Sequence, residues 1–225
     1  HNRPYTADDL VRIITLLRDP VNGCPWDKVQ THTSIRMNFL EEAYEAVDAL
    51  DLDDPVLMCE ELGDVLMQVA FHTCMEQETG RFTWEQVCDG VCQKLIERHP
   101  NIFGTQPGYE GITDWDALKN KEKGRRTLAD DLESVPRAMP ALMRAAKLQK
   151  RAARHGAALQ GADAAALADA AENLQTAQPA SAQAEQAVGE LLFAAANLAR
   201  QAGVDPEQAL QKANEAFCTA AGPVA

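Results

Sequence analysis

Apolar residues recur every three or four positions along most of the chain, and this spacing predicts helices. The first helix is expected over residues 7–17, where Leu10, Ile14 and Leu17 share one side and Thr6 gives a start signal. Three further helices are expected in the first half of the chain, over residues 33–50, 55–77 and 83–99.

Turn-forming residues separate these helices. Asp54 followed by Pro55 predicts a capped restart directly after a tight turn, so the second and third helices should form an antiparallel pair. Gly80 and Pro100 are expected to end the third and fourth helices. The segment 19–32 contains two prolines, a glycine and a tryptophan, and we expect it to be an ordered loop.

The second half of the chain has a different composition. Residues 101–131 are rich in Gly, Lys and Asp with little periodicity, apart from a short helical piece at 115–123, and they predict a linker region. A second helical block is expected over residues 135–217, with a turn at Pro179 between Ala-rich helices. We therefore expect two domains, at residues 1–131 and 132–225.

In this 225-residue chain, 46% of the residues are hydrophobic, which is enough to build a buried core. Only 5% are aromatic, whereas Ala, Leu, Glu and Gln are abundant, and this mixture favours helices over sheets. The predicted fold class is all-α. Thirty-four acidic residues against 21 basic ones give a formal net charge of -13, which repels the phosphate backbone of a nucleic acid. Nucleic acid is therefore not an expected partner, whereas a small phosphorylated ligand could bind through divalent cations.

The six cysteines include no CxxC pair, which predicts free thiols in a reducing cytoplasm. No apolar run approaches the roughly 18 residues of a membrane span, and the N-terminus shows no signal-peptide core. We expect a cytoplasmic protein that has no membrane partner.

Four acidic residues indicate the chemistry of the first half. In a helix pair folded about residue 53, Glu42 lies opposite Asp64. Glu45 lies opposite Glu61 in the same register. Any one of these acids could belong to a solvated helix face, but apolar residues border both pairs and favour a metal site within a helical bundle. Hard oxygen ligands in such number suit Mg²⁺, with Mn²⁺ as a substitute, rather than zinc.

These acids stand in motifs that resemble those of a known family. Glu41-Glu42-x-x-Glu45 and Glu61-x-x-Asp64 are similar to the EExxE and ExxD signature of the MazG nucleotide pyrophosphohydrolases, within the all-α NTP pyrophosphatase superfamily. The resemblance covers residues 7–130. It extends to the segments Gly23-Cys24-Pro25-Trp26-Asp27, Gly63-Asp64-Val65-Leu66, Lys94-Leu95 and Arg98-His99-Pro100.

The resemblance implies a reaction in which water attacks a nucleoside triphosphate between its α and β phosphorus atoms. The products would be a nucleoside monophosphate and pyrophosphate. Glu42, Glu45, Glu61 and Asp64 are then expected to hold the metal ions, which neutralise phosphate charge and lower the pKa of a bound water.

Other residues receive roles from the same resemblance. Glu41 lies one position away from the face of the metal ligands, so it is expected to orient or deprotonate the water. Lys94 and Arg98, four residues apart on one helical face, are expected to bind phosphate oxygens. Trp26 and Lys28 are expected to border the base and phosphate pocket, although Trp26 could equally anchor its loop.

The second half resembles the C-terminal domain of tandem MazG proteins, which implies two copies of one four-helix-bundle type of fold. Its metal-binding positions depart from the pattern, because Ala187-Val188-Gly189-Glu190 replaces ExxD and Ala171-Glu172-Asn173-Leu174-Gln175 replaces EExxE. We expect this domain to be catalytically silent and structural. Family members dimerise through their helix pairs, so a homodimer is expected.

Two alternative functions remain open at this point. The first is another enzyme of the same superfamily, acting on dUTP or phosphoribosyl-ATP. The second is a non-catalytic helical scaffold or regulator, in which the acid cluster binds metal only for stability. The sequence fixes neither the base preference nor the sugar preference, because both depend on the shape of a packed pocket.

Overall fold

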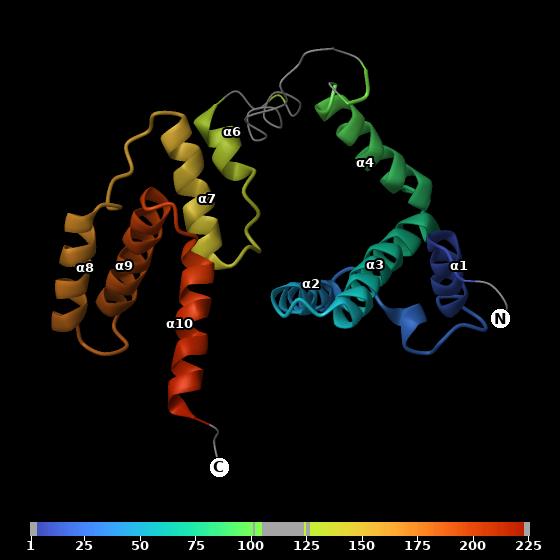
Figure 1. Ribbon diagram of the computed structural model, residues 1–225, viewed down its shortest axis with the longest axis horizontal. Coiled ribbons are helices and arrows are strands. Elements are labelled where there is room, and N and C mark those ends of the chain that lie inside the picture. Colours follow the sequence, from blue (N-terminus) through green and yellow to red (C-terminus); the bar gives the residue numbers. More distant parts are fainter. Residues whose placement is uncertain (1–3, 101, 105–123, 125–126, 223–225) are drawn as a thin grey trace. The chain divides into compact units, whose positions relative to one another are not determined.

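The computed structural model describes residues 4–100, 102–104, 124 and 127–222, and the regular elements of these residues are all helices. This confirms the predicted all-α fold (Figure 1). The chain divides into two compact units, His1–Ile112 and Thr113–Ala225. The helical piece expected at 115–123 lies outside the described residues.

In its described residues, the first unit contains four α-helices and one turn of 3₁₀-helix. They are α1 (Ala7–Leu17), η1 (Asp27–Val29), α2 (Arg36–Asp51), α3 (Pro55–Glu78) and α4 (Trp84–Arg98). The predicted bounds of α1 are confirmed, because the Thr6 side chain accepts from the Asp9 backbone N–H and the Asp9 side chain accepts from the Thr6 backbone N–H. The start of α2 was predicted three residues too early, since Thr31 and Ser34 bond to each other's backbone and form a turn instead.

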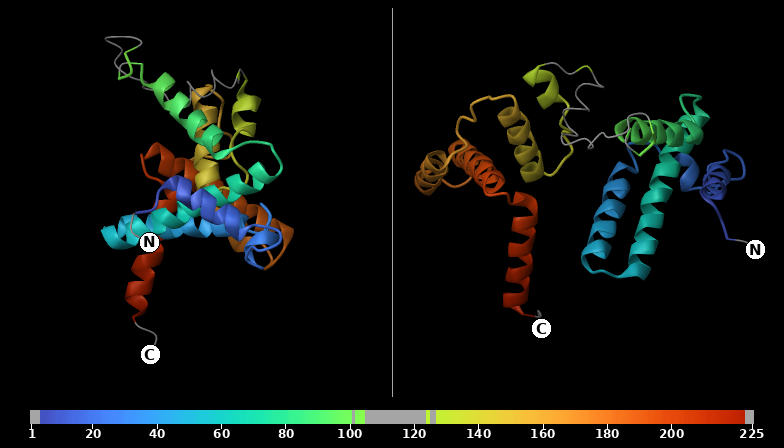
Figure 2. Two further views of the ribbon diagram at one scale, coloured as in Figure 1. Left: turned by 90° about the vertical axis from the view of Figure 1, so that its right-hand side faces the viewer. Right: turned by 45° about the horizontal axis from the view of Figure 1, so that its top comes forward.

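An antiparallel hairpin of α2 and α3 is the central feature of this unit, and Figure 2 shows the two helices side by side. Asp53 adopts a left-handed backbone conformation with a φ of 54°, which ends α2 and reverses the chain. The Asp54 carboxylate then caps α3 by accepting from two backbone N–H groups of its first turn. Ala46 and Ala49 are buried on α2, and their small side chains allow the two helices to approach closely.

The apolar core of the first unit forms on the other side of α3, where α1 and the start of α4 pack. Its buried members are Ile14, Ile35, Ala70, Phe71, Cys74, Met75 and Trp84. Arg18 is 8% exposed at the edge of this core, with its guanidinium carbon 5.2 Å from the centroid of the Phe71 ring.

Arg18 also fixes the loop that precedes α2. Its guanidinium donates to both carboxylate oxygens of Glu78, at 2.5 and 2.8 Å. A second edge of the same guanidinium donates to the backbone carbonyls of Asp27 and Gln30, at 2.8 and 3.2 Å. One buried cation therefore ties the loop to the C-terminal end of α3, which explains why the predicted loop is ordered.

The second unit contains five α-helices in the described residues. They are α6 (Leu128–Glu133), α7 (Ala141–Arg154), α8 (Ala164–Thr176), α9 (Ala182–Gln201) and α10 (Pro206–Ala221). The predicted turn at Pro179 is confirmed between α8 and α9, which form a second antiparallel hairpin. The helical block extends four residues beyond the predicted end at Phe217.

Small residues and buried amides hold the second unit together. Its buried alanines lie on α7, α8 and α9 and in the loop before α8. They are Ala152, Ala162, Ala170, Ala187, Ala194 and Ala196. The Gln149 side chain donates to the backbone carbonyl of Phe193 at 2.7 Å, which joins α7 to α9. The Asn197 side chain donates to the carbonyl of Ala162 at 2.6 Å and fixes the loop before α8.

A buried ion network attaches α6 to α7. The Asp131 side chain is 1% exposed, and its two oxygens lie 3.0 Å from Arg151 and 2.9 Å from Arg154. His155 lies 3.2 Å from the same carboxylate. This network attaches α6 to the second unit. The two units divide between Ile112 and Thr113, whereas the sequence predicted the boundary between residues 131 and 132, inside α6.

The state of the cysteines and the membrane-spanning character of the helices can be compared with the predictions from the sequence. All six cysteines are free, as predicted, and three of them are exposed: Cys59, Cys92 and Cys218. Among the helices of the described residues, none combines the length and the apolar character needed to cross a bilayer.

Candidate active site

The α2–α3 hairpin brings three of the four predicted metal ligands into one cluster. One carboxylate oxygen from each of Glu42, Glu45 and Glu61 lies within 4.8 Å of the others. Glu42 and Glu61 are half-buried and Glu45 is exposed, so the cluster opens to solvent. The side chains meet because the short turn at Asp53 sets the register of the two helices.

Asp64, the fourth predicted ligand, lies one helical turn after Glu61 on α3 and is half-buried. Its charge acts on the other acids. The pKa of Glu61 is raised by partial burial and then by the charges of Asp64, Glu60 and Glu42. The pKa of Glu42 is also raised, mainly by partial burial, with further contributions from the charges of Asp64 and Glu45.

Partial burial and the repulsion between neighbouring carboxylates both disfavour the ionised forms of Glu42 and Glu61. Acids a few ångströms apart repel one another, and the repulsion ends when a divalent cation binds between them. Carboxylate oxygens are the donors that Mg²⁺ and Mn²⁺ prefer. Those of Glu42, Glu45 and Glu61 meet in the cluster, and Asp64 lies one helical turn after Glu61. The arrangement therefore fits a hard divalent cation.

Gln68 is a residue of this site that the sequence pattern did not indicate. Its side chain is 7% exposed, and its amide nitrogen donates to Glu42 Oε1 at 3.3 Å. This hydrogen bond acts to lower the pKa of Glu42 and so opposes the effect of burial. A polar residue four positions after Asp64, in an otherwise apolar stretch of α3, was the available signal.

The remaining residues of the predicted site lie in different places. Glu41 is exposed on α2, directly before Glu42. Lys94 is exposed and Arg98 is half-buried near the end of α4. Figure 1 shows that α4 starts beside the end of α3 and that its C-terminal end points away from the α2–α3 hairpin. The structure thus does not gather Lys94 and Arg98 with the carboxylates.

Trp26 and Lys28 belong to the loop that Arg18 fixes. Trp26 is 56% exposed, and its ring meets the edge of the Phe71 ring with centroids 6.5 Å apart. Lys28 is half-buried in η1 and faces Asp19, whose pKa is lowered by backbone N–H groups and, to a smaller extent, by the Lys28 charge. The contact between the Trp26 and Phe71 rings supports the alternative in which Trp26 anchors the loop.

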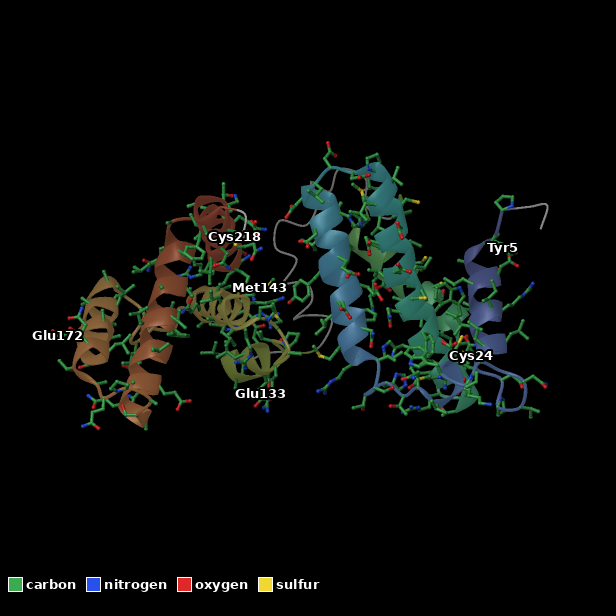
Figure 3. All side chains as sticks on the ribbon, turned by 90° about the horizontal axis from the view of Figure 1, so that it is seen from below. Tyr5, Cys24, Glu133, Met143, Glu172 and Cys218 are labelled. Atoms are coloured by element: carbon green, nitrogen blue, oxygen red, sulfur yellow. The ribbon has the colours of Figure 1, made fainter. Side chains whose placement is uncertain are left out.

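The second unit offers no matching cluster in its described residues, where no three His, Cys, Asp or Glu side chains gather as they do on α2 and α3. Glu172 is exposed on α8, and Figure 3 shows it on the side away from α9. Glu190 receives a hydrogen bond from Gln186 at 2.8 Å and lines a groove with Asp169.

Comparison with known proteins gives a family match for the part of the chain that contains the cluster. The sequence model of the MazG nucleotide pyrophosphohydrolase domain matches residues 30–103. This segment includes α2, α3 and α4, and hence all four predicted metal ligands.

Named relatives align with most of the chain. A nucleoside triphosphate pyrophosphohydrolase of Escherichia coli is 41% identical over 93% of this chain and 83% of its own length. The nucleoside triphosphate pyrophosphohydrolase/pyrophosphatase MazG of Thermotoga maritima is 39% identical over 93% of this chain and 82% of its own length. A nucleoside triphosphate pyrophosphohydrolase of Mycobacterium tuberculosis is 34% identical over 67% of this chain and 46% of its own length.

Proposed function

Because this chain belongs to the MazG family of nucleotide pyrophosphohydrolases, we propose that it hydrolyses nucleoside triphosphates to the monophosphate and pyrophosphate. The observation that carries this proposal is the meeting of Glu42, Glu45 and Glu61 within 4.8 Å on the α2–α3 hairpin. A triphosphate can bind at these carboxylates, although both carry negative charge, when divalent cations lie between the carboxylates and the phosphates.

The chain's residues have distinct parts in this reaction. Glu42, Glu45, Glu61 and Asp64 would hold Mg²⁺, with Mn²⁺ as a substitute. When bound, the metal neutralises phosphate charge and lowers the pKa of water. Glu41, next to this set and exposed to solvent, would orient the attacking water or accept its proton.

A direct assay tests this function. The purified chain is incubated with ATP and Mg²⁺, and the products are separated. AMP and pyrophosphate are the expected products, and chelation of Mg²⁺ should abolish their release. ADP and orthophosphate would contradict the proposed position of attack, and no turnover of any nucleotide would favour the scaffold alternative. Including dUTP and phosphoribosyl-ATP separates the related enzymes of the superfamily.

Binding of the metal should depend on pH in a defined direction. The pKa values of Glu42 and Glu61 are raised, so protons compete with the cation, and affinity should fall as the pH decreases through these raised values. The loss should be about tenfold per pH unit for each proton displaced. Mn²⁺ titration calorimetry at a series of pH values measures this effect.

The same shifts predict how the metal-free protein behaves. A carboxyl group whose pKa is raised on folding stabilises the folded state at pH values below its unfolded pKa, and this contribution is lost as the pH rises through the folded pKa. Near neutral pH the ionised carboxylates repel one another in the metal-free protein, and a bound cation removes this repulsion. Stabilisation of the fold by metal should therefore be largest near neutral pH. An affinity for Mn²⁺ that stays constant as the pH is lowered through the carboxyl range would contradict the assignment of Glu42 and Glu61 as ligands.

We further propose that the second unit is structural and that the chain forms a homodimer. The α2–α3 hairpin leaves large apolar side chains in solvent, an arrangement typical of an association surface. The exposed side chains are Tyr44 54%, Val47 49%, Leu62 52% and Leu66 40%. Association of two hairpins would remove this surface from water.

Replacement of one of these residues should dissociate the dimer. In Leu62→Asp, a charge would have to be buried in the interface, so sedimentation equilibrium should give the mass of a monomer. Leu16→Asp is the matched control, because Leu16 is 70% exposed on α1, outside the hairpin surface. A wild-type monomer, or equal dissociation by both variants, would contradict this interface.

A further inference from the structure

A second feature of the first unit lies beside the carboxylate cluster. It is a groove of about 500 Å³ formed by the loop before α2 together with α2, α3 and α4. Its walls are mainly aromatic and apolar, and their polar members are His32, His72, Thr73 and Glu76. The lining residues that matter are His32, Phe39, Val69, His72, Phe82 and Val87.

The groove begins one helical turn from the cluster. Phe39 lies three residues before Glu42 on α2, and His72 lies four residues after Gln68 on α3. Gln68 bridges the two regions, because it donates to Glu42. With a rise of 1.5 Å per residue, the groove residues lie about 5 to 15 Å from the acidic residues, measured along the axes of α2 and α3. A ribose and its phosphates bridge a similar span between the metal and the base of a bound nucleotide.

Two histidines in contact with each other, His32 and His72, supply polar groups to the lining of the groove. The two Nδ1 atoms of His32 and His72 lie 2.7 Å apart, and the rings stack with centroids separated by 5.0 Å. His32 Nε2 lies 2.5 Å from Glu76 Oε1, and the Glu76 side chain is 8% exposed. Arg81 contacts the same oxygen at 2.7 Å. Glu76 therefore favours a proton on the His32 nitrogen that faces it.

The hydrogen bond between the histidines then sets the tautomer of His72. A contact between two Nδ1 atoms can hold only one proton. With the His32 proton on Nε2, His32 Nδ1 accepts and the shared proton comes from His72 Nδ1. Burial lowers the pKa of His72, which favours its neutral form, so its Nε2 carries no proton. This leaves one nitrogen acceptor in a groove whose lining is mainly apolar and aromatic.

We propose that this groove is the base subsite for a nucleoside triphosphate whose phosphates bind at the carboxylate cluster. Phe39 and Phe82 supply flat apolar surface against the base, and His72 Nε2 accepts a hydrogen bond from an amino or ring N–H group of the base. The inference rests on the proposed function and adds a specificity-determining site to it.

The experiment compares a nucleotide with inorganic tripolyphosphate, which carries the phosphates but lacks the base. In Phe39→Ala, the KM for ATP should rise about tenfold to a hundredfold, because stacking against the base is lost. Val87→Phe should raise the KM similarly by filling the groove from α4, without a change in the α2–α3 hairpin. The inhibition constant of tripolyphosphate should stay within about twofold of wild type in both variants, because its contacts lie at the acids.

Two further variants sharpen this test. His72→Phe keeps an aromatic ring but removes the acceptor, and it should raise the KM for ATP about fivefold. Phe103→Ala is the matched control, since Phe103 is 52% exposed and lies outside the groove lining. Thermal melting of each variant shows whether the fold is kept.

The outcomes separate the subsite from the proposed function. A wild-type chain that releases pyrophosphate from no nucleotide overturns both. An active wild type overturns the subsite alone if Phe39→Ala and Val87→Phe leave the KM for ATP unchanged. The subsite is also overturned if both variants weaken tripolyphosphate as much as ATP.

Discussion

Replacement of Glu61 by Gln should reduce pyrophosphate release from ATP by about a thousandfold or more. Glu61 is one of the three acids that meet within 4.8 Å, and an uncharged amide in its place loses the negative charge and is a weaker ligand for the cation. Metal coordination contributes several kcal/mol to stabilising the charge of the transition state, and each 1.4 kcal/mol is about tenfold in rate. Steady-state kinetics with saturating Mg²⁺ measures the loss.

The matched control is Glu190→Gln in the second unit, where the change should be less than about twofold. Glu190 is exposed on α9 and is hydrogen-bonded to Gln186. The same pair of variants shows which half of the chain carries the activity. Equal losses in both would place the reaction elsewhere, and an effect confined to Glu190→Gln would transfer it to the second unit.

The second large effect should be on stability, in Asp131→Asn. Asp131 is fully buried and faces Arg151 and Arg154 at 3.0 and 2.9 Å. Its replacement leaves the guanidinium of Arg151, a residue that is 6% exposed, without the Asp131 counter-charge. Removal of one partner from a buried ion pair costs about 3 to 5 kcal/mol, which corresponds to roughly 10 to 20 °C in the melting temperature of the second unit.

Differential scanning calorimetry measures this loss. Asp169→Asn serves as the control, because Asp169 is an exposed aspartate of the same unit and should change the unfolding free energy by less than about 0.5 kcal/mol. Catalysis by Asp131→Asn should persist below its melting temperature, since the carboxylate cluster belongs to the first unit. An unchanged melting temperature would show that the buried network does not hold α6 in place.

Local signals in the sequence were sufficient for much of the fold. The bounds of α1 follow from the reciprocal cap between Thr6 and Asp9, which involves residues three apart. The register of the hairpin follows from the turn at Asp53 and the cap at Asp54, and this register is what brings Glu42 and Glu61 together. A motif predicts geometry well when one short turn connects its two parts.

Features that depend on contacts distant in sequence were not predicted. The pairing of His32 with His72 joins residues 40 positions apart, and no spacing rule links a loop residue to a residue in the middle of α3. The anchor between Arg18 and Glu78 likewise spans 60 positions. The helix α6 was missed for a different reason: six residues are too few to show a helical period, and the tie of Asp131 to α7 holds it in place.

The position of the metal is the central claim, and diffraction tests it directly. Crystals soaked in Mn²⁺ and measured at the manganese absorption edge should show an anomalous peak between the carboxylates of Glu42, Glu45, Glu61 and Asp64. The peak should be absent from crystals of Glu61→Gln prepared in the same way. A peak at other residues, or none at these four acids at saturating Mn²⁺, would contradict the account.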